Sequence, residues 1–343
     1  MQASGAERRQ TELCEAVDRL LAEAGVSGIL AHELGPLAAH RLRRRGEPVP
    51  AALAREERGA VLATLTARPL LERVRDLADG PLLLIKGPEV AERYPGRARR
   101  FADLDLLSQR AEQVHAALMD SGFVEVFDPE FEVTPEHHHL PPVRWGEVPL
   151  SVEVHKAPNW LPRAPRPPVE ELFEACLPSA LAIEGISTPA PVHHALVLAV
   201  HAWRHEPLRR LRDLLDVAVV AAPLDQRELE RTARRWGIER VWRTTSEAID
   251  AVFYGGRTTA PLRTWGRSLP LVRERTRLEK HLERLLHAYW ELPPHRATLS
   301  LVTSLGETIA PLPGETWADK VRRVARALRE PGAPVERRPR GPS

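Results

Sequence analysis

The organisation of this chain can be read outward from residues 82–107, LLLIKGPEVAERYPGRARRFADLDLL. The segment begins with four aliphatic residues, which end at Lys86 and Gly87. It closes with two aspartates, Asp103 and Asp105, on either side of one leucine. Short apolar runs bounded by glycine are typical of buried strands. The segment therefore predicts a strand at each of its ends, joined by a turn and an arginine-rich loop.

The strand pattern continues beyond the aspartates. We predict an amphipathic helix over residues 111–121, a third strand in FVEVF (123–127) and a fourth in PLSVEVH (149–155). Residues 157–168, APNWLPRAPRPP, contain too much proline for a helix or a central strand and are predicted to be a linker. From residue 169 onward the apolar spacing is helical again.

These elements predict an α+β protein, with a small mixed β-sheet core between N-terminal helices and a C-terminal helical domain. The final residues are rich in proline and arginine and poor in apolar side chains, so we expect them to be disordered. The expected division is an N-terminal helical segment at 1–78, the α/β core at 79–165, the C-terminal helical domain at 166–328 and a disordered tail at 329–343.

The composition restricts the class of protein. The 343 residues are 43% hydrophobic and 28% charged, which is typical of a globular protein. The formal net charge of +2 gives no general attraction to nucleic acid or to a membrane surface. No apolar run reaches the length of a membrane span. Cys14 and Cys176 lie far apart and form no metal-type or redox-type pair, so we expect a cytoplasmic protein.

The carboxylates of two strands are predicted to converge. Alternate side chains of a strand share a face, so Asp103 and Asp105 point the same way, as do Ser151, Glu153 and His155. If the two strands are neighbours, three carboxylates meet on one face. Such oxygen ligands suit Mg²⁺, and two such ions can activate an attacking oxygen and stabilise a leaving pyrophosphate. The alternative is that the aspartate pair belongs only to a solvated strand edge.

Basic residues lie close to the aspartate pair. Lys86 and Gly87 end a buried strand and open a helix-like segment, whose first backbone N–H groups can meet phosphate oxygens. Arginine also suits triphosphate binding, although four arginines in one loop can equally form a solvated surface. The loop before the aspartates contains Arg93, Arg97, Arg99 and Arg100.

As a set, these motifs resemble the polymerase-β-like nucleotidyltransferase superfamily, and within it a bacterial group described as uncharacterised nucleotidyltransferases. That group has a K-G turn, a Y-P pair, an arginine four residues before a D-[IL]-D-L-L strand, a histidine cluster, a v-E-l-H strand, an H-x-x-x-H pair and a distal aspartate. The resemblance covers roughly residues 10 to 220. The matching positions are Lys86-Gly87, Tyr94-Pro95, Arg99, Asp103 to Leu107, His137 to His139, Val152 to His155, His201, His205 and Asp216.

One position departs from the superfamily pattern. The superfamily commonly has Gly-Ser or Gly-Gly after the first strand, whereas Gly87 is followed here by Pro88. Proline suits the first position of a helix but has no N–H to offer to a phosphate.

The resemblance implies an enzyme that transfers a nucleoside monophosphate from an NTP to an acceptor and releases pyrophosphate. Mg²⁺ is the implied cofactor, with Mn²⁺ as a possible substitute, and ATP is the expected NTP. Asp103, Asp105 and Glu153 would be catalytic and would hold the metal, while Lys86, Gly87 and Arg99 would bind the nucleotide. Two rivals remain: a non-catalytic nucleotide-binding or interaction protein that keeps the fold, and phosphoryl transfer at the same metal site.

The acceptor cannot be read from the sequence. The candidates are a small molecule, a peptide or protein, or an RNA end, while the near-zero net charge disfavours a long nucleic acid.

The histidines offer further candidates. Residues 135–142, PEHHHLPP, invite a zinc interpretation, but adjacent histidines cannot all face one metal. We predict instead that His138, His139 and His155 contact the nucleotide or the acceptor, the alternative for the first two being an exposed loop. The sequence leaves open whether His201, His205 and Asp216 are structural or functional; a hydrogen-bond network between helices is favoured over a metal site.

Overall fold

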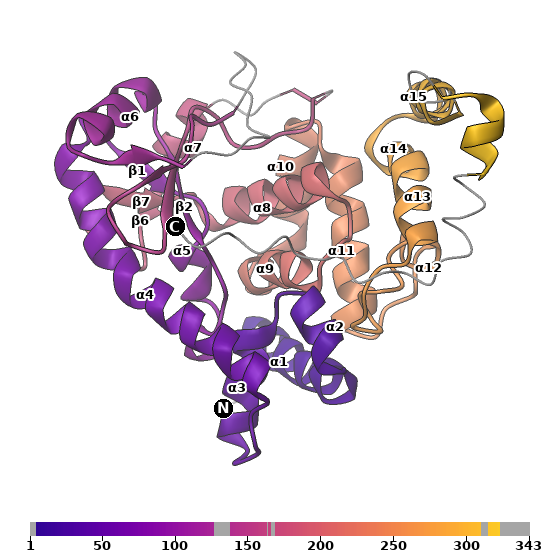
Figure 1. The fold of residues 1–343 in the computed structure, drawn as a ribbon, viewed down its shortest axis with the longest axis horizontal. Coiled ribbons are helices and arrows are strands. Elements are labelled where there is room, and N and C mark those ends of the chain that lie inside the picture. Colours follow the sequence, from indigo (N-terminus) through magenta and orange to yellow (C-terminus); the bar gives the residue numbers. More distant parts are fainter. Residues whose placement is uncertain (1–4, 127–137, 163, 166–168, 310–314, 323–343) are drawn as a thin grey trace. The chain divides into compact units, whose positions relative to one another are not determined.

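A computed structural model describes residues 5–126, 138–162, 164–165, 169–309 and 315–322. The described residues fall into two compact units, divided after Glu274 (Figure 1). The finer division expected from the sequence stays a prediction, and the tail expected at 329–343 lies outside the described residues.

The first unit contains a mixed β-sheet of seven strands, in the order β3-β4-β5-β2-β1-β7-β6. β2 pairs parallel with β5, and β1 pairs parallel with β7, while the other neighbours are antiparallel. The strands are β1 (Leu82–Leu84), β2 (Asp103–Leu107), β3 (Val124–Glu125), β4 (Val143–Arg144), β5 (Ser151–His155), β6 (Leu177–Pro178) and β7 (Ile186–Thr188).

Strands predicted from the sequence appear where the alternating or apolar runs are long. β1, β2 and β5 lie within the predicted runs, and β3 forms at the start of the FVEVF segment. The prediction of helix from residue 169 onward was wrong for β6 and β7, and β4 was not predicted. These three strands have two or three residues each, too few to show a period of two.

One face of the sheet packs against helices to form the core. The apolar side chains of β2 and β5, which alternate with the carboxylates, are buried in one cluster with side chains of α4 and α6. Figure 1 shows these two helices beside the sheet. α4 contributes Ala67, Leu71 and Val74 to this cluster, at helical spacing. The helices before and within the sheet are α1 (Gly5–Glu23), α2 (Val26–Ala31), α3 (Gly35–Arg44), α4 (Ala51–Leu77), α5 (Pro88–Ala91), the 3₁₀ turn η1 (Pro95–Arg97), α6 (Ala111–Asp120) and α7 (Val169–Glu174).

The remaining helices of the first unit follow the sheet. α8 packs along α9, and its His194 Nε2 donates a hydrogen bond to the carbonyl oxygen of Ile85, 2.6 Å away, just after β1. This contact connects the helical region to the end of the strand that leads into Lys86. The helices are α8 (Pro191–His205), α9 (Leu211–Ala221), α10 (Gln226–Arg235), α11 (Glu239–Phe253) and α12 (Ala260–Thr264).

The second unit is helical in its described part. It contains α13 (Arg277–Leu286), α14 (Ala288–Glu291) and α15 (Pro294–Ile309), and α13 begins with a capping box between Thr276 and Glu279. With the mixed sheet and the helices on both sides of it in the chain, the expected α+β class is confirmed.

Candidate active site

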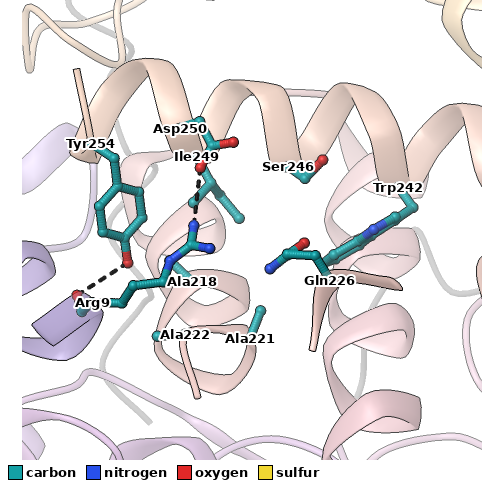
Figure 2. A pocket seen from close by; sticks show the side chains of 10 residues that line it. All are labelled: Arg9, Ala218, Ala221, Ala222, Gln226, Trp242, Ser246, Ile249, Asp250 and Tyr254. Carbon is teal, nitrogen blue, oxygen red and sulfur yellow. Dashed lines mark hydrogen bonds and ion pairs between the residues drawn. The ribbon is translucent and has the colours of Figure 1, made fainter. Parts of the chain in front are cut away.

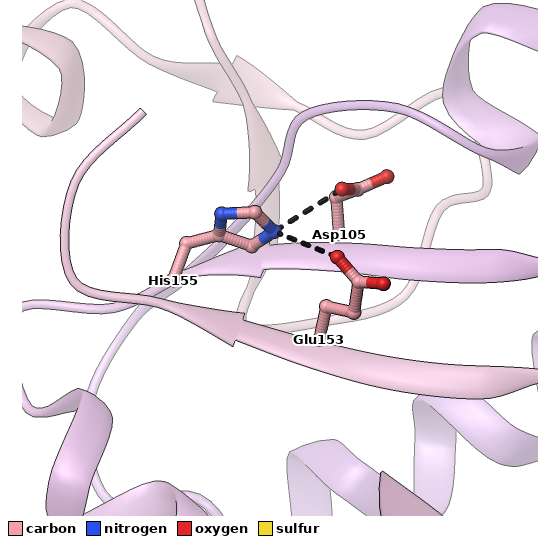
Figure 3. A group of neighbouring side chains, drawn as sticks. All are labelled: Asp105, Glu153 and His155. Carbon is pink, nitrogen blue, oxygen red and sulfur yellow. Dashed lines mark hydrogen bonds and ion pairs between the residues drawn. The ribbon is translucent and has the colours of Figure 1, made fainter. Parts of the chain in front are cut away.

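The two strands that carry the carboxylates are direct neighbours. In the parallel pair of β2 and β5, Asp105 lies opposite Glu153, and Leu107 lies opposite His155. Because side chains alternate along each strand, Asp105, Glu153 and His155 project from the same face, away from the α4–α6 core. Figure 3 shows the three side chains gathered over the two strands. The adjacency on which the sequence prediction depended is therefore confirmed for this strand pair.

His155 lies between the two carboxylates. Its Nε2 is 3.1 Å from Oδ1 of Asp105 and 3.6 Å from Oε2 of Glu153 (Figure 3). Since both neighbours are acceptors, Nε2 must carry the proton and donate it to Asp105. Burial lowers the pKa of His155, but the hydrogen bonds to Asp105 and Glu153 outweigh it and raise that pKa to about 9. The imidazolium therefore offsets part of the negative charge of the pair.

The two carboxylates of this group are close enough to share a cation, with His155 beside them as a hydrogen-bond donor rather than a ligand. One ligand atom from each of Asp105, Glu153 and His155 lies within 4.8 Å of the other two. Within the described part of the chain, Oδ2 of Asp105 and Nδ1 of His155 are buried without a hydrogen-bond partner. A buried carboxylate oxygen without a partner is costly unless something binds it, so the group fits a cation. Carboxylate oxygens are the ligands that Mg²⁺ and Mn²⁺ prefer.

Asp105 remains ionised in this position. Burial raises its pKa, but the charge of Lys86 and the hydrogen bond from His155 outweigh burial and hold the pKa below its ordinary value. Its side chain is only 5% exposed, so these partners act with little screening by solvent.

Asp103 lies two residues earlier on the same face, and it is partly exposed. It is outside the group of ligand atoms found among the described residues. Burial and the negative charge of Asp105 raise its pKa to about 6, with Glu153 acting in the same direction and Lys86 opposing them. Two carboxylates this close cannot both ionise easily without a cation.

Lys86 supplies a positive charge beside the carboxylates. Its charge favours the ionised forms of Asp103 and Asp105 and acts to lower the pKa of each. The Nζ atom is 2.6 Å from Nε2 of His201 on α8. From the sequence alone the role of His201 was open, because no local pattern pairs two residues that are 115 positions apart.

Gly87 forms the turn that follows Lys86. Its φ is 62°, and a Cβ placed there would lie 2.8 Å from the carbonyl oxygen of Asp103. Only glycine fits this turn without moving β2, since both the positive φ and the close backbone approach exclude a side chain. The following helix, α5, has only four residues.

Arg99 is held by Asp216 rather than by the carboxylate group. Its Nε and Nη2 atoms each donate to one oxygen of Asp216 at 2.7 Å, and Nη1 contacts the carbonyl oxygen of Gly87 at 3.4 Å. The hydroxyl of Tyr94 donates to the same carboxylate at 2.7 Å. Both charged side chains are almost fully buried. Three members of the sequence motif, Tyr94, Arg99 and Asp216, are thus joined in one hydrogen-bonded group.

Two further histidines lie beside the carboxylate group. The rings of His138 and His139 are 5.4 Å and 5.2 Å from the ring of His155, centroid to centroid. Burial lowers the pKa of His139, against a hydrogen bond to Leu140 and the charge of Glu153. His137, the first residue of the cluster, lies outside the described residues.

A separate, narrow hollow lies between α1, α9, α10 and α11 (Figure 2). Arg9 crosses it and pairs with Asp250 at 3.1 Å, beside Tyr254 and Gln226. None of the carboxylates of β2 and β5 lines it. Because its main charges already neutralise one another, it offers a weaker ligand site than the sheet face does.

A family model described as "Uncharacterised nucleotidyltransferase" matches residues 14–253. The chain belongs to this family. The match covers the whole sheet and the helices that contribute His201 and Asp216. Comparisons with curated proteins and with solved structures found no significant match.

Family membership makes this protein a nucleotidyltransferase by relationship, which implies an NTP substrate and, as is typical of such enzymes, a metal ion. The carboxylates in the group of Asp105, Glu153 and His155 could hold that ion. Among the described residues, no helix is both long and apolar enough to cross a bilayer.

Proposed function

We propose that this protein transfers a nucleoside monophosphate from an NTP, with ATP as the expected donor, to a small molecule, a peptide or a protein. Pyrophosphate is the second product, and Mg²⁺ is the cofactor, with Mn²⁺ as a substitute. The observation that carries the proposal is the register of β2 and β5, which sets Asp105 beside Glu153 and leaves Oδ2 of Asp105 buried without a partner among the described residues.

Asp105 and Glu153 would hold the cation, and Asp103 would complete the oxygen donors from the same face. Bound Mg²⁺ would polarise the phosphate and offset the charge of the leaving pyrophosphate. His155 orients Asp105 through its Nε2–H, which leaves the second oxygen of that carboxylate for the cation. Its role resembles that of the residues that fix metal ligands from behind.

The reaction breaks the bond between the α-phosphorus and the oxygen that bridges to the β-phosphate. The acceptor oxygen forms the new bond to the α-phosphorus and loses its proton. The side chain of Glu153 is 22% exposed, so an acceptor molecule that arrives from solvent can reach it, and we assign it the role of taking that proton. Lys86 would face the β- and γ-phosphates, where the negative charge of the leaving group grows.

The nucleotide would also meet His138 and His139, because their rings adjoin His155. We assign Arg99 and Gly87 an indirect role in nucleotide binding. Arg99 contacts the carbonyl oxygen of Gly87 and so anchors the turn that positions Lys86. A cytoplasmic location is proposed from the two cysteines, both free and without a bonding partner in the described structure.

The test measures pyrophosphate and ADP release together. The purified protein is incubated with each labelled NTP and Mg²⁺, with and without cell extract as the source of acceptor. Pyrophosphate and a labelled product support nucleotidyl transfer, ADP points to phosphoryl transfer, and NTP binding without turnover points to the non-catalytic rival. Glu153→Gln should remove the product, whereas Glu125→Gln, a matched change on the exposed edge strand β3, should not.

A further inference from the structure

The Lys86 ammonium is held by an imidazole rather than by a carboxylate. Nζ of Lys86 lies 2.6 Å from Nε2 of His201, which is a hydrogen-bond distance. A lysine ammonium can only donate, so the imidazole nitrogen must accept and cannot carry a proton at that position. Burial, the charge of Lys86 and the neighbouring His205 all lower the pKa of His201, which agrees with a neutral ring.

A neutral partner has an electrostatic consequence for the site. A carboxylate in the place of His201 would fix the ammonium equally well but would cancel its charge. The imidazole fixes the direction of the ammonium without adding another negative charge beside it. Two of the three N–H donors also remain for other acceptors.

The His201 ring is itself packed against a second histidine, which is held in turn by Asn159. The ring of His205, one turn later on α8, lies 4.5 Å away from it, centroid to centroid. Nδ2 of Asn159, from the segment after β5, is 3.3 Å from Nε2 of His205 and donates to it. The chain that follows Glu153 and His155 is therefore connected through α8 to Lys86.

We propose that His201 is a positioning residue, a neutral acceptor that aims the Lys86 ammonium at the polyphosphate chain of the NTP without cancelling its charge. This role rests on the proposed function, because it needs an anionic substrate beside the carboxylates. His205 and Asn159 hold the ring in place and do not touch the substrate.

Three substitutions at His201 separate its role in positioning the Lys86 ammonium from the effect of its charge. His201→Gln keeps a neutral acceptor at nearly the same reach, His201→Leu removes the acceptor, and His201→Glu replaces it with a charged one. The probes are ATP with Mg²⁺ and inorganic tripolyphosphate, with binding measured by calorimetry. Loss of a hydrogen bond to a charged group should weaken ATP binding about tenfold in the Leu variant. The Gln variant should bind as the parent does, and the Glu variant should bind more weakly than the Leu variant.

A second measurement tests the Lys86–His201 contact without a nucleotide. The chain has four lysines, so protein labelled with ¹³C at lysine Cε gives few signals, and Lys86→Arg identifies the one from Lys86. That signal should move in the Leu and Glu variants and stay close to its original position in the Gln variant. His115→Gln, on α6, is the matched control and should move no lysine signal.

The two measurements distinguish a failure of the proposed function from a failure of the positioning role of His201. If the parent binds neither probe, the proposed function is wrong, and with it the assignment of His201 to a polyphosphate site. If the parent binds ATP but the Lys86 signal ignores every His201 variant, the contact is absent in solution and the positioning role is overturned. Equal binding in the Gln and Glu variants would also overturn it, because the charge of the acceptor would then be irrelevant. If the Leu variant does not fold, this Gln and Glu comparison still decides.

Discussion

Replacing Asp216 with leucine should cost the first unit much of its stability. The carboxylate accepts two bonds of 2.7 Å from Arg99 and a third of 2.7 Å from Tyr94, and both charged side chains are at most 5% exposed. Asp216→Leu leaves the guanidinium buried without a counter-charge. Breaking one partner of a buried pair in this way costs about 3–5 kcal/mol. We expect a loss of that size in the free energy of unfolding, measured by urea denaturation followed by fluorescence and circular dichroism.

A double-mutant cycle isolates the pair from its surroundings. Adding Arg99→Met to Asp216→Leu removes the buried charge, so most of the lost stability should return. The control is Asp250→Leu, which breaks the exposed pair with Arg9 and should cost less than about 1 kcal/mol. A loss below about 1 kcal/mol for Asp216→Leu, with no coupling to Arg99, would refute the reasoning.

The same double variant also tests what Arg99 does. From the sequence, Arg99 was expected to bind the nucleotide, whereas in the structure its guanidinium contacts Asp216 and the carbonyl oxygen of Gly87. If Arg99 acts through the turn, a double variant with restored stability should still bind ATP with less than tenfold loss. A loss similar to that of Lys86→Ala would mean that Arg99 contacts the triphosphate.

Three further changes test other parts of the site and fold. Asp105→Asn should lower the rate of pyrophosphate release about 10²–10³-fold or more, because it removes negative charge that stabilises the transition state. The melting temperature should stay within a few degrees of the parent, and unchanged release at an unchanged melting temperature would show that Asp105 is not a catalytic residue. Gly87→Ala should destabilise the fold by at least about 1 kcal/mol, because the new Cβ would lie 2.8 Å from the carbonyl oxygen of Asp103 at a φ of 62°. Thermal denaturation measures this loss, and Gly59→Ala, at an open helical position, is the control. Burial lowers the pKa of His194 from 6.5 to about 4, so the stability that depends on the neutral ring is present above pH 6.5 and is lost as the pH falls to about 4. The full loss is about 3 kcal/mol in the free energy of unfolding, and His194→Gln should show a flatter pH dependence of that free energy in this interval.

The carboxylate face was predictable because it follows from a short-range rule. A period of two places Asp105 on one face of its strand and Glu153 and His155 on one face of theirs, and the apolar residues between them show which face is buried. Only the adjacency of the two strands had to be assumed, and the structure confirms it. The sequence also put His155 on the correct face, although its place between the two carboxylates depends on the parallel register.

The contacts made from α8 and α9 were not predictable in the same way. His201 meets Lys86 from 115 positions away, and Asp216 meets Arg99 from 117 positions away. No periodicity relates such residues, because only the packing of whole helices against the sheet brings them together. The resemblance to a family marked them as a set, but their partners had to come from the structure. β6 and β7 were missed for a different reason, since their pairing comes from neighbouring strands rather than from their own short sequences.

The wide separation of these partners also affects the order in which the site can assemble during synthesis. Lys86, Arg99 and both strand aspartates leave the ribosome well before Asp216 does, and at typical elongation rates the interval is on the order of ten seconds. Throughout that interval the guanidinium of Arg99 has no carboxylate from α9 to bury against, and for most of it, until His201 emerges on α8, Lys86 has no imidazole. We therefore expect β2 and β5, the strands that carry the carboxylates, to stay incompletely packed in the nascent chain until α9 has emerged. A polypeptide ending before residue 216 would then carry every strand of the sheet and still bind no nucleotide.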